Sequence, residues 1–424
     1  MSEAEIRQNI KKLLDSNLRH GYSDAFQTEY WTIHPSPETY PFQYFWDTCL
    51  HALILINLDE AELATKTLRS LYAMQAEDGF VGHMLYWDRL TPATWTDTFQ
   101  AKFEDLNRPH MSALVQPPLS AQALYRIWHH TKDDAFLQEM LPKLKKHFDW
   151  LAAHRDLDGD GLLTIINMFE SGIDWKPTMD AVYKHDGTAS QGLYDKVIGN
   201  DYFHFVNNYD PAKAKVKAPF LVKEVAFNTI YARNLEVLSK LCKQVGDSDG
   251  AVKYDNLSQK VNNAIQTKMY DSQDAAFWDL RAPDDQPLKT LTPTIFFPII
   301  LPTTTHDQAR AILDKHFHNE QEFATTYPLP SVAVNDPSFD PAASKFLWRG
   351  PTWMLYNWYI YQALFHNGFE AEAETLRSST LMLIGKSGFR EYYNPMSGEG
   401  GGAQHFTWSG LVLDMLTQSE APHV

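Results

Sequence analysis

Residues 44–75 read YFWDTCLHALILINLDEAELATKTLRSLYAMQ, and they predict two helices joined by the short turn LDE. The first part of the stretch is an apolar helical pattern. The second part begins with Asp59, a residue type that favours the N-cap position, and Glu62 three positions later resembles a capping box. Leu68 and Leu71 then fall on one face at helical spacing. The stretch therefore predicts a helical hairpin.

Helical patterns of this kind recur along most of the chain. They cover about residues 3–19, 44–57, 59–75, 119–131, 134–153, 222–245, 248–270, 305–316, 349–366, 368–384 and 403–418, with weaker patterns at 187–199 and 291–300. Pro142 lies inside one of these patterns, so that helix is expected to bend or to restart there. Strand-like alternation is scarce.

Four segments between the helices are long, and they hold most of the tryptophan, tyrosine, glycine and acidic residues outside helices. They cover about residues 76–118, 154–221, 317–348 and 385–402. Long connections in a compact domain are usually functional. About a dozen paired helices with long loops at one end predict an all-α fold, an (α/α)6 barrel formed by one domain over residues 1–424. A superhelical solenoid is the alternative, but solenoids have regular repeat lengths and lack such loops.

The acidic net charge argues against nucleic acid and membranes as partners. The net charge of −16 opposes binding to phosphate backbones and to anionic lipid headgroups, so we expect neither nucleic acid nor membrane as a partner. The start, MSEAEIRQNIKKLL, carries charges where a signal peptide needs an apolar region. Cys49 and Cys242 lie in apolar helical patterns and are expected to be buried, reduced thiols. We expect a cytoplasmic protein, either a monomer or a homodimer.

The stretch ESGIDWKPTMD at 170–180 has neither a helical stripe nor strand alternation, and it places Asp174 between Ile173 and Trp175. Apolar neighbours raise the pKa of a carboxyl group, which is what an acid that must hold a proton near neutral pH requires. Asp174 is therefore a candidate general acid for glycoside hydrolysis. The simpler alternative is a loop aspartate that caps backbone N–H groups.

A second carboxylate is available near the C-terminus, in FREYYNPMSGEGGGAQHFTWSG at 389–410. Glu391 beside two tyrosines and Glu399 in the glycine run are both candidates. The glycine run lacks the ending of a phosphate-binding loop, so it indicates close passage of backbone against a ligand or a helix.

Aromatic residues outside helices suggest a lined cavity, since the chain has twelve tryptophans and each indole N–H needs a partner. Trp46 and Asp47 stand at the start of an apolar helix and could form a platform for a sugar ring, or else a packed tryptophan and an N-cap. Trp348 precedes an aromatic-rich helix and is a candidate ligand contact.

A metal site finds little support. The stretch HRDLDGDGLL at 154–163 begins like a calcium loop, with Asp156, Asp158 and Asp160 before a glycine. The position of the bidentate glutamate is Asn167, so a tight Asp/Gly turn is the better interpretation. We expect no metal.

Five segments together resemble glycoside hydrolase family 63, in the order found there. They are QYFWDTCL, LVQPPLSAQAL, ESGIDWKPTMD, LWRGPTWMLYNWYIYQAL and EYYNPMSGEGGGAQHFTWSG. The likeness runs from about residue 40 to 415. The mannosylglycerate and glucosylglycerate hydrolases of bacteria are the most similar members in length and spacing, and the ESG-x-D motif is shared with the trehalases of family 37.

The resemblance implies an (α/α)6 barrel and an inverting hydrolase that needs no cofactor. It makes Asp174 the general acid and prefers Glu391 to Glu399 as the general base. It also implies a set of sugar contacts: Tyr40, Trp46, Asp47, Tyr86, Gln116, Trp348 and Gln404, with His83 in the same loop as Tyr86. The expected substrate is a small α-glucoside or α-mannoside, with 2-O-α-glucosyl- or mannosylglycerate as the leading possibility.

One feature departs from the expectation for a glycerate glycoside. Its carboxylate favours a bidentate arginine, yet no arginine occurs between Arg155 and Arg233. The long segment 154–221 offers lysines instead: Lys176, Lys184, Lys196, Lys213, Lys215 and Lys217. The alternatives are a trehalase-like α-glucosidase acting on disaccharides, a sugar epimerase or isomerase on the same barrel, and a carbohydrate-binding protein without catalysis.

Overall fold

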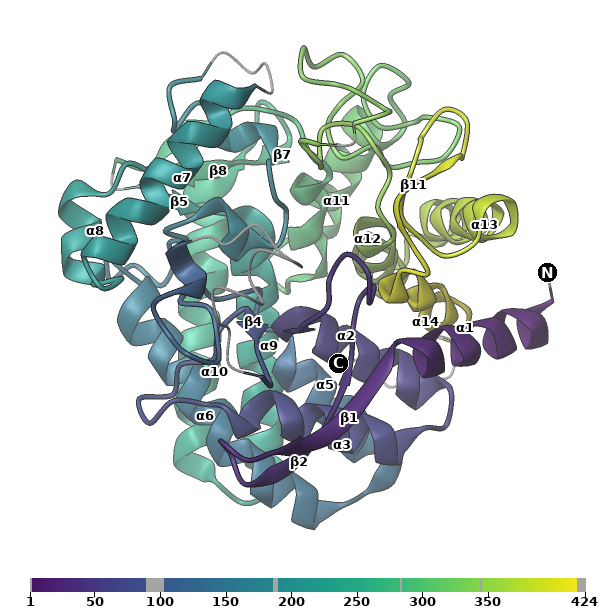
Figure 1. The fold of residues 1–424 in the computed structure, drawn as a ribbon. Helices are drawn as coiled ribbons and strands as arrows, with labels where there is room; N and C mark the ends of the chain where they lie inside the picture. The colour runs from purple at the N-terminus through teal and green to yellow at the C-terminus, as the bar shows by residue number, and fades with distance from the viewer. Residues whose placement is uncertain (1, 89–102, 186–189, 283, 344, 418–424) are drawn as a thin grey trace.

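The computed structural model describes residues 2–88, 103–185, 190–282, 284–343 and 345–417, and it is mainly helical (Figure 1). The α-helices are α1 (Glu3–Asn17), α2 (Phe45–Asn57), α3 (Ala61–Ala73), α5 (Ser120–Thr131), α6 (Asp134–Arg155), α7 (Gln191–Val206), α8 (Pro211–Lys217), α9 (Val225–Gln244), α10 (Ser248–Ala264), α11 (His306–Ile312), α12 (Met354–His366), α13 (Glu370–Ser387) and α14 (Val412–Thr417). Short 3₁₀ segments are η1 (Phe103–Asp105), η2 (Met168–Ser171), η3 (Pro177–Met179), η5 (Pro293–Ile300) and η7 (Thr407–Leu411). Two π-helical turns, η4 (Ile265–Met269) and η6 (Leu313–Phe317), extend α10 and α11.

Small antiparallel sheets of short strands supplement the helices, which remain the main regular structure, as expected for an all-α fold. The strands are β1 (Leu18–Ser23), β2 (Thr28–Ile33), β3 (Gln43–Tyr44), β4 (Met84–Leu85), β5 (Val222–Lys223), β6 (Tyr270–Asp271), β7 (Ala276–Phe277), β8 (Asp279–Arg281), β9 (Gln286–Leu288), β10 (Arg390–Tyr393) and β11 (Gly400–Gln404). They pair as β1-β2, β3-β4, β5-β8-β9, β6-β7 and β10-β11. Most have only two or three residues, too few for an alternating pattern to be recognised in the sequence.

The helices form inner and outer members of packed pairs. Going around the molecule, α2 packs against α5, α5 against α9, α9 against η5, η5 against α12, and α12 against η7 and α14. Segment α14 packs back against α2, which closes the ring. Each inner segment also contacts one outer helix. The pairs, inner segment first, are α2–α3, α5–α6, α9–α10, η5–α11, α12–α13 and η7–α1. Helices far apart in sequence thus become neighbours (Figure 1).

The hairpin of residues 44–75 shows how the sequence separates inner from outer helices. Helix α2 is buried at every position from Phe45 to Ile56, whereas α3 buries one face that includes Leu68 and Leu71. One detail was predicted wrongly: the N-cap of α3 is Glu60 rather than Asp59, which lies in the turn with φ 62°. Of the two alternatives expected at Pro142, a restart is excluded, because α6 continues through that residue as one helix.

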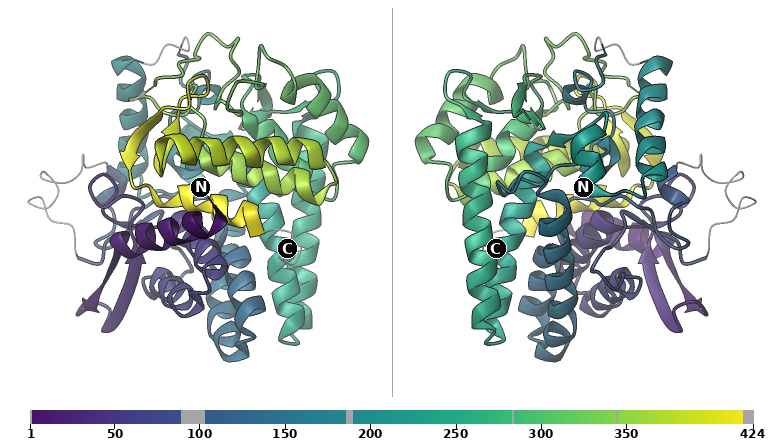
Figure 2. Two further views of the ribbon diagram at one scale, coloured as in Figure 1. Left: turned by 90° about the vertical axis from the view of Figure 1, so that its right-hand side faces the viewer. Right: turned by 90° about the vertical axis from the view of Figure 1, so that its left-hand side faces the viewer.

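The long loops and the tips of the longest helices lie at opposite ends of the molecule. Figure 2 shows the loops around residues 317–348 at the upper end and the tips of α6, α9 and α10 at the lower end. The long segment 154–221 is less irregular than expected, because α7 and α8 lie within it. The apolar core is one large cluster from Ile6 to Met415, with a small second cluster formed by Tyr44, Met84 and Tyr86. Among the described residues, none of the helices combines the length and the apolar character that crossing a membrane requires.

Asp414 joins four helices of the inner ring at a fully buried carboxylate. It accepts hydrogen bonds from Arg126 of α5 (2.9 Å), Asn57 of α2 (2.7 Å) and Trp358 of α12 (2.8 Å). Burial alone would raise the pKa of this carboxyl group, but the Arg126 guanidinium and the neutral donors outweigh burial and hold the pKa below its ordinary value. The last helix is therefore held to the first half of the chain by a charged group in the core.

Replacing Asp414 by alanine should destabilise the protein strongly, since the Arg126 guanidinium would remain buried without its partner. We expect the free energy of unfolding to fall by about 3–5 kcal/mol, measured by urea unfolding. Asp284→Ala is the matched control, because Asp284 pairs with Arg281 on the exposed surface and should cost no more than about 1 kcal/mol. Equal losses in the two variants would contradict the assigned role of Asp414.

Candidate active site

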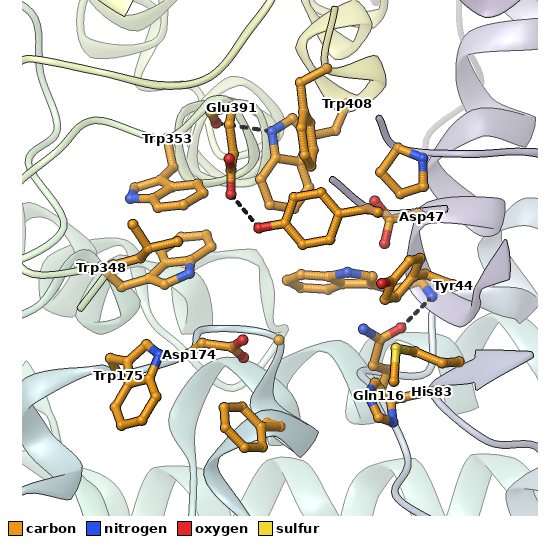
Figure 3. A pocket seen from close by; sticks show the side chains of 18 residues that line it. Tyr44, Asp47, His83, Gln116, Asp174, Trp175, Trp348, Trp353, Glu391 and Trp408 are labelled. Carbon is orange, nitrogen blue, oxygen red and sulfur yellow. Dashed lines mark hydrogen bonds between the residues drawn. The ribbon is translucent and has the colours of Figure 1, made fainter. Parts of the chain in front are cut away.

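A cavity of about 300 Å³ opens among the long loops (Figure 3). Its walls contain tryptophan and tyrosine rings and three carboxyl groups, together with smaller apolar groups. The lining residues are Pro35, Tyr40, Tyr44, Trp46, Asp47, His83, Met84, Gln116, Phe169, Gly172, Asp174, Trp175, Leu347, Trp348, Trp353, Glu391, Phe406 and Trp408.

Glu391 enters the cavity from β10, and its carboxylate is held at both oxygens. Oε1 accepts a hydrogen bond of 2.6 Å from the Tyr40 hydroxyl, and Oε2 accepts one of 2.8 Å from the backbone N–H of Ala403. Burial raises the pKa of Glu391 above its ordinary value, although these two hydrogen bonds act in the opposite direction. The carboxylate is thus oriented, shielded from water and still able to accept a proton.

The glycine run beside Glu391 has a steric role. Gly402 has φ +63°, a left-handed conformation, and a Cβ atom there would overlap the Glu391 carboxylate and the Tyr392 ring. The backbone therefore passes close to a catalytic candidate on β10, and not against a helix. Glu399, the alternative to Glu391, is exposed and does not line the cavity.

Asp174 approaches the cavity from the opposite side to Glu391 (Figure 3). Its neighbours Ile173 and Trp175 are both buried, as predicted, while Asp174 itself is only partly buried. Gly172, with φ +68°, lets the chain pass beneath Trp46, whose ring would lie 2.6 Å from a Cβ atom at that position. The turn therefore presents Asp174 beside an aromatic wall.

The other charged groups of ESGIDWKPTMD are held in buried ion pairs. Glu170 accepts from Arg155 at 2.7 Å, and Lys176 donates to Glu224 at 2.5 Å. Asp180 forms a bidentate pair with Arg349, at 2.8 and 2.6 Å. Buried ion pairs of Glu170, Lys176 and Asp180 therefore hold the motif in place. Among its acidic groups, Asp174 is the one that faces the cavity.

Trp46, Asp47 and Gln116 line the cavity where the first turn of α2 reaches it. The Gln116 carbonyl oxygen accepts from the backbone N–H of Trp46 at 3.0 Å, which links two predicted site residues directly. Asp47 is fully buried, and burial raises its pKa to about 7. A carboxyl group in this state can donate a hydrogen bond to a sugar hydroxyl or accept one from it.

Trp348 lies flat against Trp353, with ring centroids 3.7 Å apart and planes inclined by 6°. Trp408 meets both rings edge-on and donates from Nε1 to the backbone oxygen of Glu391 at 3.2 Å. Trp348 has φ 62°, unusual for a bulky residue, and such strain is typically found at functional sites. These rings form an apolar wall suited to the face of a pyranose ring.

The structure brings together most, but not all, of the predicted site residues. Tyr40, Trp46, Asp47, Gln116, Trp348, Asp174, Glu391 and His83 line the cavity. Tyr86 and Gln404 are not among the lining residues: Tyr86 hydrogen-bonds Asp105 in a small separate cluster, and Gln404 is exposed on β11. Sequence reasoning missed Tyr44, Phe169 and Phe406, whose aromatic patterns are indistinguishable from core packing.

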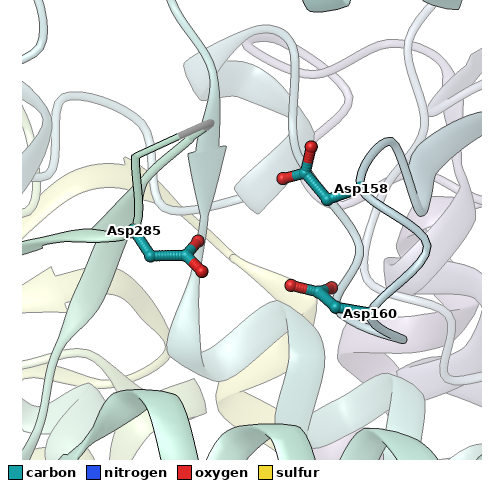
Figure 4. A group of neighbouring side chains, drawn as sticks. All are labelled: Asp158, Asp160 and Asp285. Atoms are coloured by element: carbon teal, nitrogen blue, oxygen red, sulfur yellow. The ribbon is translucent and has the colours of Figure 1, made fainter.

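The lysines proposed to hold a carboxylate lie elsewhere. Lys176 is buried against Glu224, and the other five are exposed and do not line the cavity. Around the Asp/Gly turn, Asp158, Asp160 and Asp285 point toward one another (Figure 4). The ammonium group of Lys223 lies 2.7–2.8 Å from all three, so it already occupies the position that a cation would take.

Comparison with known proteins places the chain in a family. The profile described as the mannosylglycerate hydrolase MGH1-like glycoside hydrolase domain matches residues 40–409. Mannosylglycerate hydrolase of Rubrobacter radiotolerans is 26% identical over 91% of this chain and 92% of the relative. Glucosylglycerate hydrolase of Mycolicibacterium hassiacum is 26% identical over 90% of this chain and 93% of the relative.

Solved structures show the same fold. The crystal structure of GH63 mannosylglycerate hydrolase from Thermus thermophilus in complex with Tris is 24% identical, covers 97% of this chain and 100% of that chain, and has a TM-score of 0.85. The family match spans most of the chain and confirms the predicted kinship with the mannosylglycerate hydrolases. This chain is a glycoside hydrolase that belongs to the family of mannosylglycerate hydrolase MGH1-like glycoside hydrolase domains.

Proposed function

We propose that this protein is an inverting α-glycosidase on an (α/α)6 toroid that hydrolyses 2-O-α-mannosylglycerate or 2-O-α-glucosylglycerate. The observation that carries the proposal is the position of Asp174 and Glu391 on opposite sides of one aromatic cavity, in a chain of this family. The closed ring of inner helices with outer partners supports the toroid. The names of the relatives support the substrate class.

In this mechanism one carboxyl group acts on the leaving group and the other acts on the attacking water. Asp174 gives a proton to the glycosidic oxygen as the bond from that oxygen to the anomeric carbon breaks. Glu391 takes a proton from a water molecule whose oxygen attacks the anomeric carbon from the other face. The free sugar leaves with inverted configuration, and the aglycone leaves as an alcohol.

The remaining lining residues position the sugar. Trp46 and Trp348 supply apolar surface for the faces of the ring, and Asp47 and Gln116 offer hydrogen bonds to its hydroxyl groups. A sugar epimerase would need paired histidines at the centre. His83 is the one histidine among the residues that line the cavity, so hydrolysis is the better supported reaction.

A substrate panel separates the possible substrates and the stereochemical outcome. We expect cleavage of mannosylglycerate or glucosylglycerate in preference to trehalose, kojibiose, nigerose and sucrose. Proton NMR of the first product formed should show the β-anomer, since inversion of an α-glycoside produces it. Preferential cleavage of trehalose would favour the disaccharide hydrolase, and an initial α-anomer would contradict the inverting mechanism.

Removing either carboxylate should slow turnover strongly while leaving the fold intact. Asp174→Asn and Glu391→Gln are nearly isosteric, and we expect each to lower kcat by at least about 10²-fold, the contribution usual for a positioned acid or base. Glu399→Gln is the control, because Glu399 is exposed outside the cavity. Circular dichroism checks folding, and full activity in a folded Asp174→Asn variant would refute its role.

The pH profile should report the environment of Glu391. The pKa of Glu391 is raised from its ordinary value of 4.5, so activity should fall as pH drops through a midpoint above that value, where the base becomes protonated. Tyr40→Phe removes a hydrogen bond that lowers the pKa, so the acidic limb of kcat/KM should move to still higher pH. Tyr254→Phe on α10 is the control, and a shift toward lower pH in Tyr40→Phe would contradict this account.

A further inference from the structure

Lys176 has an unusual position for a lysine, because it lies fully buried two residues after Asp174. Its ammonium group donates to Glu224 Oε1 at 2.5 Å and to the Thr294 hydroxyl at 3.0 Å, and it pairs with Asp279 Oδ2 at 2.7 Å. Each of the three donor positions of the ammonium group is used. Burial lowers the pKa of Lys176, but the two carboxylates outweigh burial and raise it, so the lysine stays charged.

The partners of Lys176 belong to rigid parts of the fold. Glu224 is the N-cap of inner helix α9 and accepts from the backbone N–H of Phe227 at 2.6 Å. Asp279 begins β8 and accepts from the N–H of Val225 at 2.8 Å. Asp279 also accepts from the Thr178 hydroxyl, a second tie to the same motif. The lysine therefore fastens the ESGIDWKPTMD segment to the first turn of α9.

A short, constrained connection joins this anchor to Asp174. Only Trp175 lies between them, and its backbone is left-handed with φ 65°. Its ring is packed edge-on against Phe169 and Phe346 and stacked on Tyr194. Because Trp175 has little freedom to absorb a shift, a movement of the backbone at Lys176 would displace Asp174.

We propose that Lys176 is a positioning residue for the proton donor, holding the Asp174 carboxyl at the glycosidic oxygen through its buried contacts with Glu224 and Asp279. This inference rests on the proposed role of Asp174. A lysine that only stabilised the fold would affect every substrate alike. A lysine that positions the acid should matter most where the leaving group needs a proton.

Glycosyl fluorides make that distinction. In their hydrolysis the bond from the anomeric carbon to fluorine breaks and fluoride departs as an anion, so no proton is required at the leaving group. The attacking water still gives its proton to the base, Glu391. Substrates with an alkoxide leaving group need both carboxyl groups, and the fluoride of the same sugar needs mainly the base.

The test compares Lys176→Met with the unaltered protein on two substrates. These are the better of glucosylglycerate and mannosylglycerate, and the α-fluoride of the same sugar. We expect kcat for the glycoside to fall by about 10²-fold, the loss typical of a displacement near 1 Å, with KM changed by less than about threefold. The fluoride should lose less than about threefold in kcat. Equal losses on both substrates, or no loss on either, would overturn the proposal.

Two further variants separate failure of this inference from failure of the proposed function. Asp174→Asn should show the same selective loss, and if it hydrolyses the glycoside normally the assignment of the acid itself fails. Lys223→Met is the matched control, since Lys223 is also buried and paired with three carboxylates but does not belong to the segment that carries Asp174. A selective loss in Lys223→Met would also overturn the proposal for Lys176.

Lys176→Met leaves two buried carboxylates without a cation, so its folding must be checked by circular dichroism. If it does not fold, the isosteric Asp279→Asn takes its place, because it removes one carboxylate and leaves the pair of Lys176 with Glu224. We expect a smaller loss, about 10-fold, again confined to the glycoside. An equal effect of Asp279→Asn on both substrates would overturn the proposal.

Discussion

The hydrogen-bonded carboxylate of Asp414 is the constraint on which the rest of the structure depends. A ring of helices closes only if the end of the chain returns to its beginning, and Asp414 joins α14 to α2, α5 and α12. The same closure completes the site. Glu391 comes from the C-terminal part of the chain, and Tyr40, which orients it, comes from the N-terminal part. The candidate base therefore has its geometry only when the ring is closed.

Buried charge recurs where the loops need fixed positions. Glu170 with Arg155, Lys176 with Glu224 and Asp279, and Asp180 with Arg349 hold one short motif. Burying ion pairs costs desolvation and contributes little net stability, so their value lies in specifying one arrangement. We infer that these buried ion pairs hold Asp174 in a single orientation, despite the desolvation that they require. Local strain at Trp175 and Trp348 is consistent with that view.

Sequence reasoning predicted the helices well because their apolar periodicity is local. It also singled out four residues that line the cavity, Asp174, Glu391, Trp46 and Asp47, from motifs that carry both chemistry and family resemblance. It failed where contacts between residues far apart in the sequence determine the position of a side chain. Nothing near Lys176 in the sequence indicates that Glu224 and Asp279 surround it, and Tyr86 turns to Asp105 rather than to the cavity. The β1-β2 hairpin was missed because its burial lacks clean alternation.

The distance between the carboxyl groups of Asp174 and Glu391 in a crystal structure with bound product tests the central claim most directly. An inverting enzyme must leave room for a water molecule between the base and the anomeric carbon, which requires a separation of about 6.5–9.5 Å. We predict a distance in that range, with an ordered water or the product hydroxyl beside Glu391. A separation of about 5 Å would indicate a retaining mechanism and would contradict the account.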